Sequence, residues 1–306
     1  MNFMKYKLLT ATLLVIFFFF TFSMEAIPQG KKEGKINWVE GYISAIGTAT
    51  ATPSGNKVKD ELRAIKGATI LGQRLLLETV KGVKIDSQTK VENMMVQEDV
   101  VNARIEGTIE GAEIVKQNVR WEGDTPIASV EVRICLGGFG VCESESSLVN
   151  VLALDQKNEQ ANVPSRRLSD IAVKQEPTVQ KVQDVIYDSS KPVTGIIFNL
   201  QGLFFERVIL PVVITVGDQN TPFTVYSVKS VEPQVIRTYG VVRYADSVDQ
   251  ASQNPHLGNN IIIVPVSGII KENIIMIGFD AARIIRETTS YGNDYLKSAK
   301  VIITSK

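Results

Sequence analysis

The chain contains two cysteines, Cys135 and Cys142, which flank a Leu-Gly-Gly-Phe-Gly-Val stretch. Its three glycines allow the positive φ angles of a tight reversal, so we expect the two thiols to face each other across a short loop. In an oxidising compartment this arrangement predicts a local disulfide. Zinc binding is the rival interpretation, but two thiolates without a nearby His or a second pair cannot fill a tetrahedral site. Because the stretch lacks the Gly-Lys-Ser/Thr ending of a phosphate-binding loop, we interpret it as a turn.

Other groups that could carry chemistry are sparse. His256 is the only histidine, and it lies in a Pro-His-Leu-Gly stretch that predicts a loop. A Ser-His-Asp triad would have to use this residue, and the chain has no Gly-x-Ser-x-Gly elbow to accompany it. The acid pairs Glu143 with Glu145 and Asp184 with Asp188 fit solvated loop charge better than a carboxylate hydrolase. We therefore predict a non-enzymatic protein without catalytic, cofactor-binding or metal-binding residues.

The amino end predicts a signal peptide over residues 1–26. Lys5 and Lys7 form its charged region, Leu8–Phe22 is apolar, and small residues precede a cleavage point near Ala26. This apolar core of about 15 residues is shorter than the about 20 that span a bilayer, which favours cleavage over anchoring. No cysteine precedes Cys135, so we expect no lipid-bearing residue after the signal. The predicted location is periplasmic or outer-membrane associated, with an extracellular location and peripheral membrane association left open.

Charge and length limit the classes of protein further. Lys and Arg total 33 and Asp and Glu total 33, and removal of residues 1–26 leaves a net charge of −1. This balance argues against a nucleic-acid partner, because such binders are normally basic. A hydrophobic fraction of 44% over 306 residues supports packed cores and predicts two domains.

In the first half, the strongest pattern is a helix over residues 57–81, ended by Gly82. A bent strand over 36–51 precedes it, and period-two alternation predicts a strand over 83–91. A short helix over 93–103 and strands over 105–121 and 126–136 follow. The last strand is expected to turn Ala128, Val130, Val132 and Ile134 to one face. The helical pattern rests on these apolar residues: Val58, Leu62, Ile65, Ala68, Leu71, Leu75 and Val80.

The second half is predicted to be rich in strands. A first α+β domain is expected over 36–150, followed by a polar linker or crossover over 151–188. Residues 147–154 are a further candidate strand that would finish the first domain. The second domain, 189–306, has candidate strands over 191–198, 208–216, 224–228, 239–244, 261–266, 274–277 and 300–304. A helix near Asp280, capped by its carboxylate, is expected to carry Ile284 and Ile285 inward. The fold class is α+β, with a long helix packed on an antiparallel sheet, then a β-rich domain with a C-terminal helix and strand.

Residues 36–135 resemble an exported family, the small outer-membrane lipoproteins related to the N-terminal domain of flagellar assembly protein T. The resemblance rests on Leu75-Leu76-Leu77-Glu78 in the helix, on Val80-Lys81-Gly82-Val83 at its end, on Ile105-Glu106-Gly107 and Gly111-Ala112-Glu113, and on Val130-Glu131-Val132. Residues from Thr194 onwards are similar to the extension of larger members. The resemblance implies an envelope protein, associated in some members with flagellar or surface assemblies. It carries over no catalytic residue, and this chain lacks the expected lipid-bearing Cys.

The sequence thus predicts a cell-envelope protein with a binding or assembly role, whose partners are envelope or surface-assembly proteins, including further copies of itself. A periplasmic small-molecule-binding module is the first alternative, with a site between the long helix and the sheet. Trp38, Tyr42 and Trp121 motivate it, although aromatic residues at strand spacing more often pack in a sheet. A hydrolase using His256 or an acid pair is the second.

Overall fold

The computed structural model describes residues 34–142, 147–152, 185–217, 221–290 and 293–305. The predicted signal peptide, Glu143, Glu145, Asp184 and most of the predicted linker lie outside these residues. Among the described residues the fold is mixed α and β, with two sheets, as the sequence predicts.

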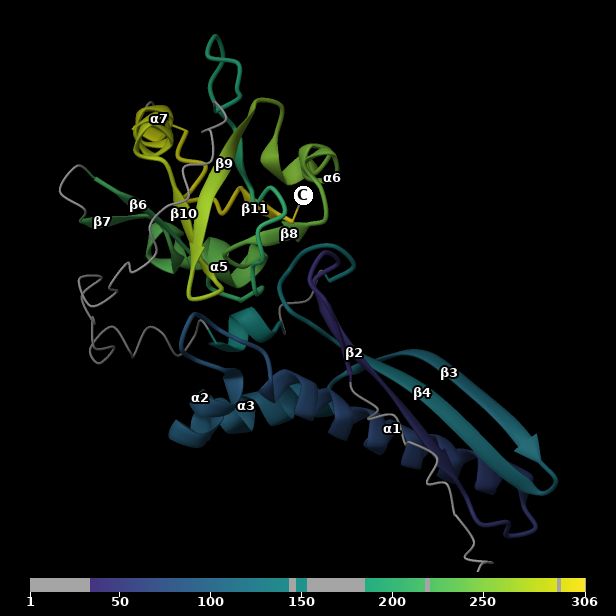
Figure 1. Ribbon diagram of the computed structural model, residues 1–306. Coiled ribbons are helices and arrows are strands. Elements are labelled where there is room, and N and C mark those ends of the chain that lie inside the picture. Colours follow the sequence, from purple (N-terminus) through teal and green to yellow (C-terminus); the bar gives the residue numbers. More distant parts are fainter. Residues whose placement is uncertain (1–33, 143–146, 153–184, 218–220, 291–292, 306) are drawn as a thin grey trace, which may run out of the picture. The chain divides into compact units, whose positions relative to one another are not determined.

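The first sheet is antiparallel, with the strand order β1-β2-β4-β3. Its strands are β1 (Lys35–Asn37), β2 (Tyr42–Thr50), β3 (Glu113–Glu122) and β4 (Thr125–Cys135). The long helix α1 (Lys57–Lys81) packs on β2 and β4 and runs along one face of the sheet (Figure 1). Two further helices, α2 (Val91–Gln97) and α3 (Asp99–Glu110), follow α1. The sheet and its helices therefore form the layered arrangement predicted for the first half.

Side-chain alternation along β4 places the core of this layer. Ala128, Val130 and Val132 are fully buried and Ile134 nearly so, and they face α1 together with Ile43 of β2. The intervening β4 residues point to the opposite face, as strand geometry requires. The predicted assignment of the two faces of this strand is thus confirmed.

The second sheet is mixed, with the strand order β7-β6-β10-β9-β5-β11-β8. Its strands are β5 (Gly195–Asn199), β6 (Val212–Val216), β7 (Pro222–Tyr226), β8 (Arg243–Ala245), β9 (Ile261–Ile270), β10 (Ile274–Ile277) and β11 (Val301–Thr304). The run β9-β5-β11-β8 is parallel, and β10 pairs antiparallel with β9. Its buried parallel strands read as continuous apolar runs, as in Ile196, Ile197 and Phe198, each fully buried.

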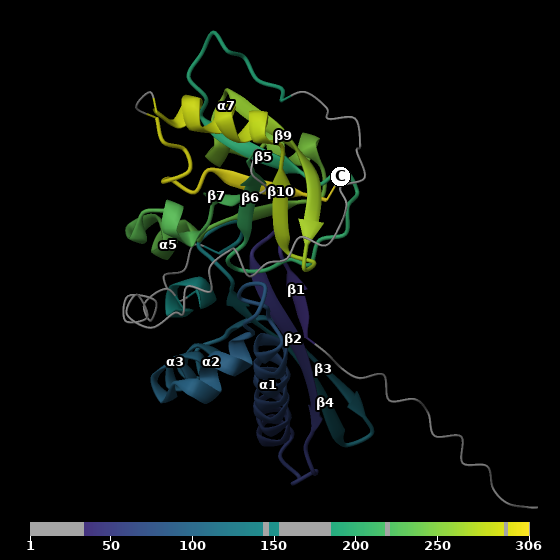
Figure 2. The same cartoon turned by 60° about the vertical axis from the view of Figure 1, so that its left-hand side comes forward.

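Helices accompany the second sheet. They are the α-helices α5 (Pro233–Tyr239), α6 (Val248–Ser252) and α7 (Phe279–Ser290) and the 3₁₀ helices η3 (Val228–Ser230) and η4 (Pro255–Leu257). α6 contacts β5, β8 and β11. α7, the yellow helix labelled in Figure 2, contacts β6. The C-terminal helix and strand of the prediction correspond to α7 and β11.

Several local predictions in the first half are wrong. The bent strand over 36–51 is two antiparallel strands, β1 and β2, joined by a turn, and the short helix over 93–103 is replaced by the two helices α2 and α3. Residues 83–91 form no strand, because Asp86 accepts hydrogen bonds from the backbone N–H groups of Gln88 and Thr89 and folds the segment into a turn. Residues 105–110 are helical and belong to α3, so the strand expected from 105 begins only at Glu113. Residues 148–152 are helical where a strand was considered. Apolar runs this short fit either structure, and tertiary packing decides between them.

In the second half, the strand expected over 239–244 shrinks to β8, because α5 occupies residues 233–239. Asp280 does not cap α7. It lies inside the first helical turn, 3.6 Å from Arg283, and Phe279 already belongs to the helix. Ile285 is buried as predicted, whereas Ile284 is only half-buried.

Candidate interaction surfaces

The long helix α1 faces the sheet with small residues. Its buried positions recur every four residues, at Asp60, Ala64, Ala68, Gly72, Leu76 and Val80. At the centre of this line the backbones nearly touch, because a Cβ atom added to Gly47 of β2 would lie 1.9 Å from the carbonyl oxygen of Ala68. Only glycine at this strand position permits so close an approach.

Because small residues occupy the buried line, larger apolar side chains of α1 remain outside. Val58 is 71% exposed, Leu62 62% and Ile70 54%. With Lys66 they recur every four residues, so they form one ridge along the helix surface. The apolar pattern that predicts the helix therefore lies partly on its solvent side.

Basic residues lie in and beside this row of side chains. Lys57, Lys59, Arg63 and Lys66 are exposed, whereas Asp60 is buried and accepts a hydrogen bond from the backbone N–H of Ser54 at 2.7 Å. The hydrogen bonds from Ser54 keep the pKa of Asp60 below its ordinary value. A shallow hollow lies at this end of α1, lined by Asn56, Val58, Lys59, Leu62, Arg63 and Lys66. We call Val58, Lys59, Leu62, Arg63, Lys66 and Ile70 the basic ridge.

The helix α3 presents a surface of opposite charge. It buries Val101, Ile105 and Ile109 and exposes the residues on its other side. Helical spacing places six exposed residues within one arc of about 120°. We call them the acidic face: Asp99, Val100, Ala103, Glu106, Gly107 and Glu110. Val100 is 56% exposed, and Val96 of the preceding α2 is 81% exposed.

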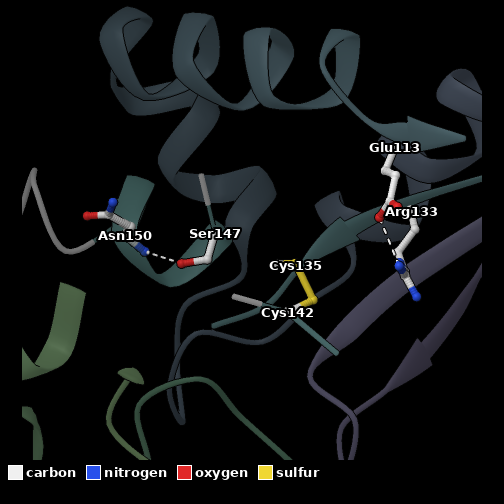
Figure 3. The surroundings of a disulfide bond; sticks show 6 residues. All are labelled: Glu113, Arg133, Cys135, Cys142, Ser147 and Asn150. Carbon is white, nitrogen blue, oxygen red and sulfur yellow. Dashed lines mark hydrogen bonds and ion pairs between the residues drawn. A yellow bond between two sulfur atoms is a disulfide. The ribbon is translucent and has the colours of Figure 1, made fainter. Parts of the chain in front are cut away.

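The two cysteines occupy the end of β4 and the loop after it, and they form a disulfide with Cα atoms 5.5 Å apart (Figure 3). Gly140 has a positive φ of 67°, so the glycine-rich stretch makes the reversal that was predicted. Phe139 is buried in this loop and packs so closely on Gly41 that a Cβ there would lie 2.6 Å from the phenyl ring. Nearby, Arg133 and Glu113 form an ion pair at 2.8 Å across β4 and β3. The disulfide and Phe139 thus hold this loop against the end of the first sheet.

His256 lies in η4 and packs into the second half of the chain. Its Nε2 is 3.1 Å from the carbonyl oxygen of Ala299, and its ring centroid is 5.2 Å from that of Tyr239. Burial, with a smaller contribution from the Arg243 guanidinium, lowers the pKa of His256 to about 4. At neutral pH the imidazole of His256 is therefore uncharged, and its contacts are those of an ordinary packed side chain.

The predicted aromatic residues do not share one groove. Trp38 meets Tyr244 edge-on, with ring centroids 5.5 Å apart, and Tyr42 lies under Arg133. Trp121 stacks beneath Lys57, whose Nζ is 5.5 Å from the ring. Each ring is accounted for by a separate packing contact. Asp188, the described member of its acid pair, accepts hydrogen bonds from Ser190, which lower its pKa to about 2.

Two negative findings apply to the part of the chain that the structure describes. No helix there is long and apolar enough to cross a membrane. No group of three or more His, Cys, Asp or Glu side chains there is placed to hold a metal ion.

Residues 195–306 match the protein family described as Treponema pallidum Tp0624, second domain. The match begins at the first residue of β5 and runs to the end of the chain, so it covers the second sheet. No curated protein matches this chain. Because the match lies outside residues 36–135, the resemblance of that region to the flagellar-assembly-related lipoproteins stays a prediction.

Proposed function

We propose that this chain is a non-enzymatic, exported protein of the cell envelope that acts by binding or assembling with other proteins. The observation that carries the proposal is the row of large apolar side chains that α1 leaves outside the core, Val58, Leu62 and Ile70. Apolar surface of this kind, bordered by charge, is typical of protein interaction sites. An interaction role needs a surface and no reacting group.

Export is supported by the signal pattern of residues 1–26 and by the disulfide between Cys135 and Cys142. Disulfides persist in oxidising compartments such as the periplasm. The resemblance of residues 36–135 to the lipoproteins related to flagellar assembly protein T makes a surface assembly the first place to look for partners.

A small-molecule site between α1 and the sheet is the weaker alternative. At Gly47 the helix and strand backbones are already in contact, and Ala64, Ala68 and Leu76 fill the layer on either side with no exposed surface. The shallow hollow described above lies instead on the outer side of α1, in the basic ridge.

Site-specific photo-crosslinking tests the proposal. A photoreactive residue replaces Leu62 in the exported full-length protein, and Thr48, exposed on the sheet face away from α1, serves as the matched control position. We expect irradiation of cells to give a discrete crosslinked species from position 62 and none from position 48. Absence of crosslinks from Leu62, Val58 and Ile70 in normally exported protein would refute an interaction at this surface.

A further inference from the structure

We propose that the occupant of the basic ridge is the acidic face of a second copy of this chain. The inference rests on the proposed function and names its partner. In the proposed assembly, one surface of each copy contacts a different surface of the next copy.

Charge sorting between the helices is the first argument. Over residues 57–74, α1 has five basic residues, Lys57, Lys59, Arg63, Lys66 and Arg74, and its acids are the buried Asp60 and the half-buried Glu61. Over residues 91–110 the balance is reversed, with the acids Glu92, Glu98, Asp99, Glu106 and Glu110 and the single base Arg104. The whole chain has equal numbers of acids and bases, so this segregation belongs to these helices. Two surfaces of opposite sign attract each other and repel their own kind.

The apolar residues make the second argument. Val58, Leu62 and Ile70 project as a row on one helix, and Val100 lies in the acidic face beside Ala103 and Gly107, whose short side chains leave space above α3. A Cβ at Gly107 would meet no atom within 4 Å. A row of large side chains on one helix packs well into a shallow row on another. Charge and shape thus point to the same pairing.

An anionic membrane is the main rival occupant, because a basic and apolar helix surface also suits lipid headgroups. Lipid binding would leave the exposed Val96 and Val100 and their neighbouring acids without a role. A second copy accounts for both surfaces, and we therefore argue for self-association and leave lipid binding as an outcome of the test.

Paired charge reversals test the inference. The first variant carries Lys59→Glu and Lys66→Glu, and the second carries Glu106→Lys and Glu110→Lys. Lys59 lies in the first turn of α1 and Glu110 is the last residue of α3, so the reversals at these two positions suit the helix dipole. Lys66 and Glu106 lie further from the helix ends and are exposed. Arg63 is left unchanged because it lies 3.7 Å from Asp60.

Each variant alone presents like charges on both surfaces, whereas an equimolar mixture offers opposite charges at every mixed contact. In sedimentation velocity at low salt, the wild-type protein should associate, and its association should weaken as salt rises. Either variant alone should weaken association by about tenfold or more, and the mixture should recover most of it. A control with Lys116→Glu and Arg286→Glu, on exposed residues of β3 and α7, should behave as wild type.

The inference is overturned if the wild type stays monomeric up to high concentration, if the variants associate normally, or if the mixture fails to recover. Sedimentation with vesicles of anionic phospholipid tests lipid binding by the basic ridge directly. Binding lost in the first variant without any change in self-association would assign the basic ridge to lipid and overturn the inference. A photo-crosslink from Leu62 to a different polypeptide would also overturn it, while leaving the proposed function intact.

Discussion

Gly47→Ala tests the close packing that pushes large residues of α1 outward. The added methyl would lie 1.9 Å from the Ala68 carbonyl oxygen and 2.3 Å from the Gly72 backbone nitrogen. Ordinary carbon contacts begin near 3.5 Å, so the helix and strand would have to separate by roughly 1.5 Å. Backbone atoms on both sides leave no side chain to rotate away. We expect the free energy of unfolding to fall by about 3 kcal/mol, the upper part of the range for overpacked cores.

Urea denaturation followed by tryptophan fluorescence measures this loss. Trp38 and Trp121 are the only tryptophans, and both lie in the first half of the chain, so the signal reports on that half. With a slope of about 2 kcal/mol per M, a loss of 3 kcal/mol lowers the midpoint by about 1.5 M.

Two other glycines provide matched comparisons. Gly72→Ala places its Cβ 3.1 Å from a methyl of Val132, a side chain that can adjust, so we expect a smaller loss. Gly107→Ala meets nothing and lies within α3, and it should stabilise the protein by about 0.5 to 1 kcal/mol. Equal midpoints for Gly47→Ala and Gly107→Ala would refute the argument that close backbone packing sets the helix position.

Three further predictions follow from single contacts. Replacing both Cys135 and Cys142 by Ser should cost about 2.5 kcal/mol, because the short closed loop restricts the unfolded chain; urea midpoints should then no longer respond to reductant. The pKa of Asp60 is lowered in the folded protein, so its ionised carboxylate stabilises the fold above the ordinary pKa of 3.8. This stabilisation is lost as the pH falls through the folded pKa. Asp60→Asn should therefore flatten the acid side of a plot of urea midpoint against pH. For His256 the folded pKa of about 4 lies below the ordinary 6.5, so stability should fall as the pH drops from about 6.5 towards 4, and the single imidazole NMR signal should titrate near 4.

Periodicity predicted the regular elements of the first half well where many residues agree. The helix over 57–81 has the predicted bounds, and β4 differs from its prediction by one residue at each end. Over 105–110 the apolar residues are too few to separate helix from strand, and the contacts of Ile105 and Ile109 with the core decide for α3. The turn at Asp86 was missed because a side-chain hydrogen bond outweighs the alternation of apolar residues.

In the second half, short buried strands gave the clearest predictions. β10 has the predicted bounds, because Ile274–Ile277 is a short apolar run between turn residues. α5 was missed although its signals are present, with Pro233 at the first helical position and Gly240 at a positive φ directly after the helix. The strand order could not be predicted, because long-range pairings such as β5 with β9 leave no local pattern.

The exposed apolar row on α1 could not be predicted, because a helical pattern shows which residues are apolar and not which of them face a sheet. Val58 and Leu62 are apolar and lie at helical spacing, so the pattern predicts them to be core residues. The buried residues in this part of α1 are instead Asp60, Ala64 and Ala68. Small residues occupy this line because they let the backbones of α1 and β2 come close together. Gly47 on the facing strand is the sequence feature that indicates this close approach. Because the sheet packs only against that line, core packing does not account for the apolar residues on the outer side of α1. The exposed apolar residues of the basic ridge are the ones that we propose to contact the acidic face of α3 in a second copy.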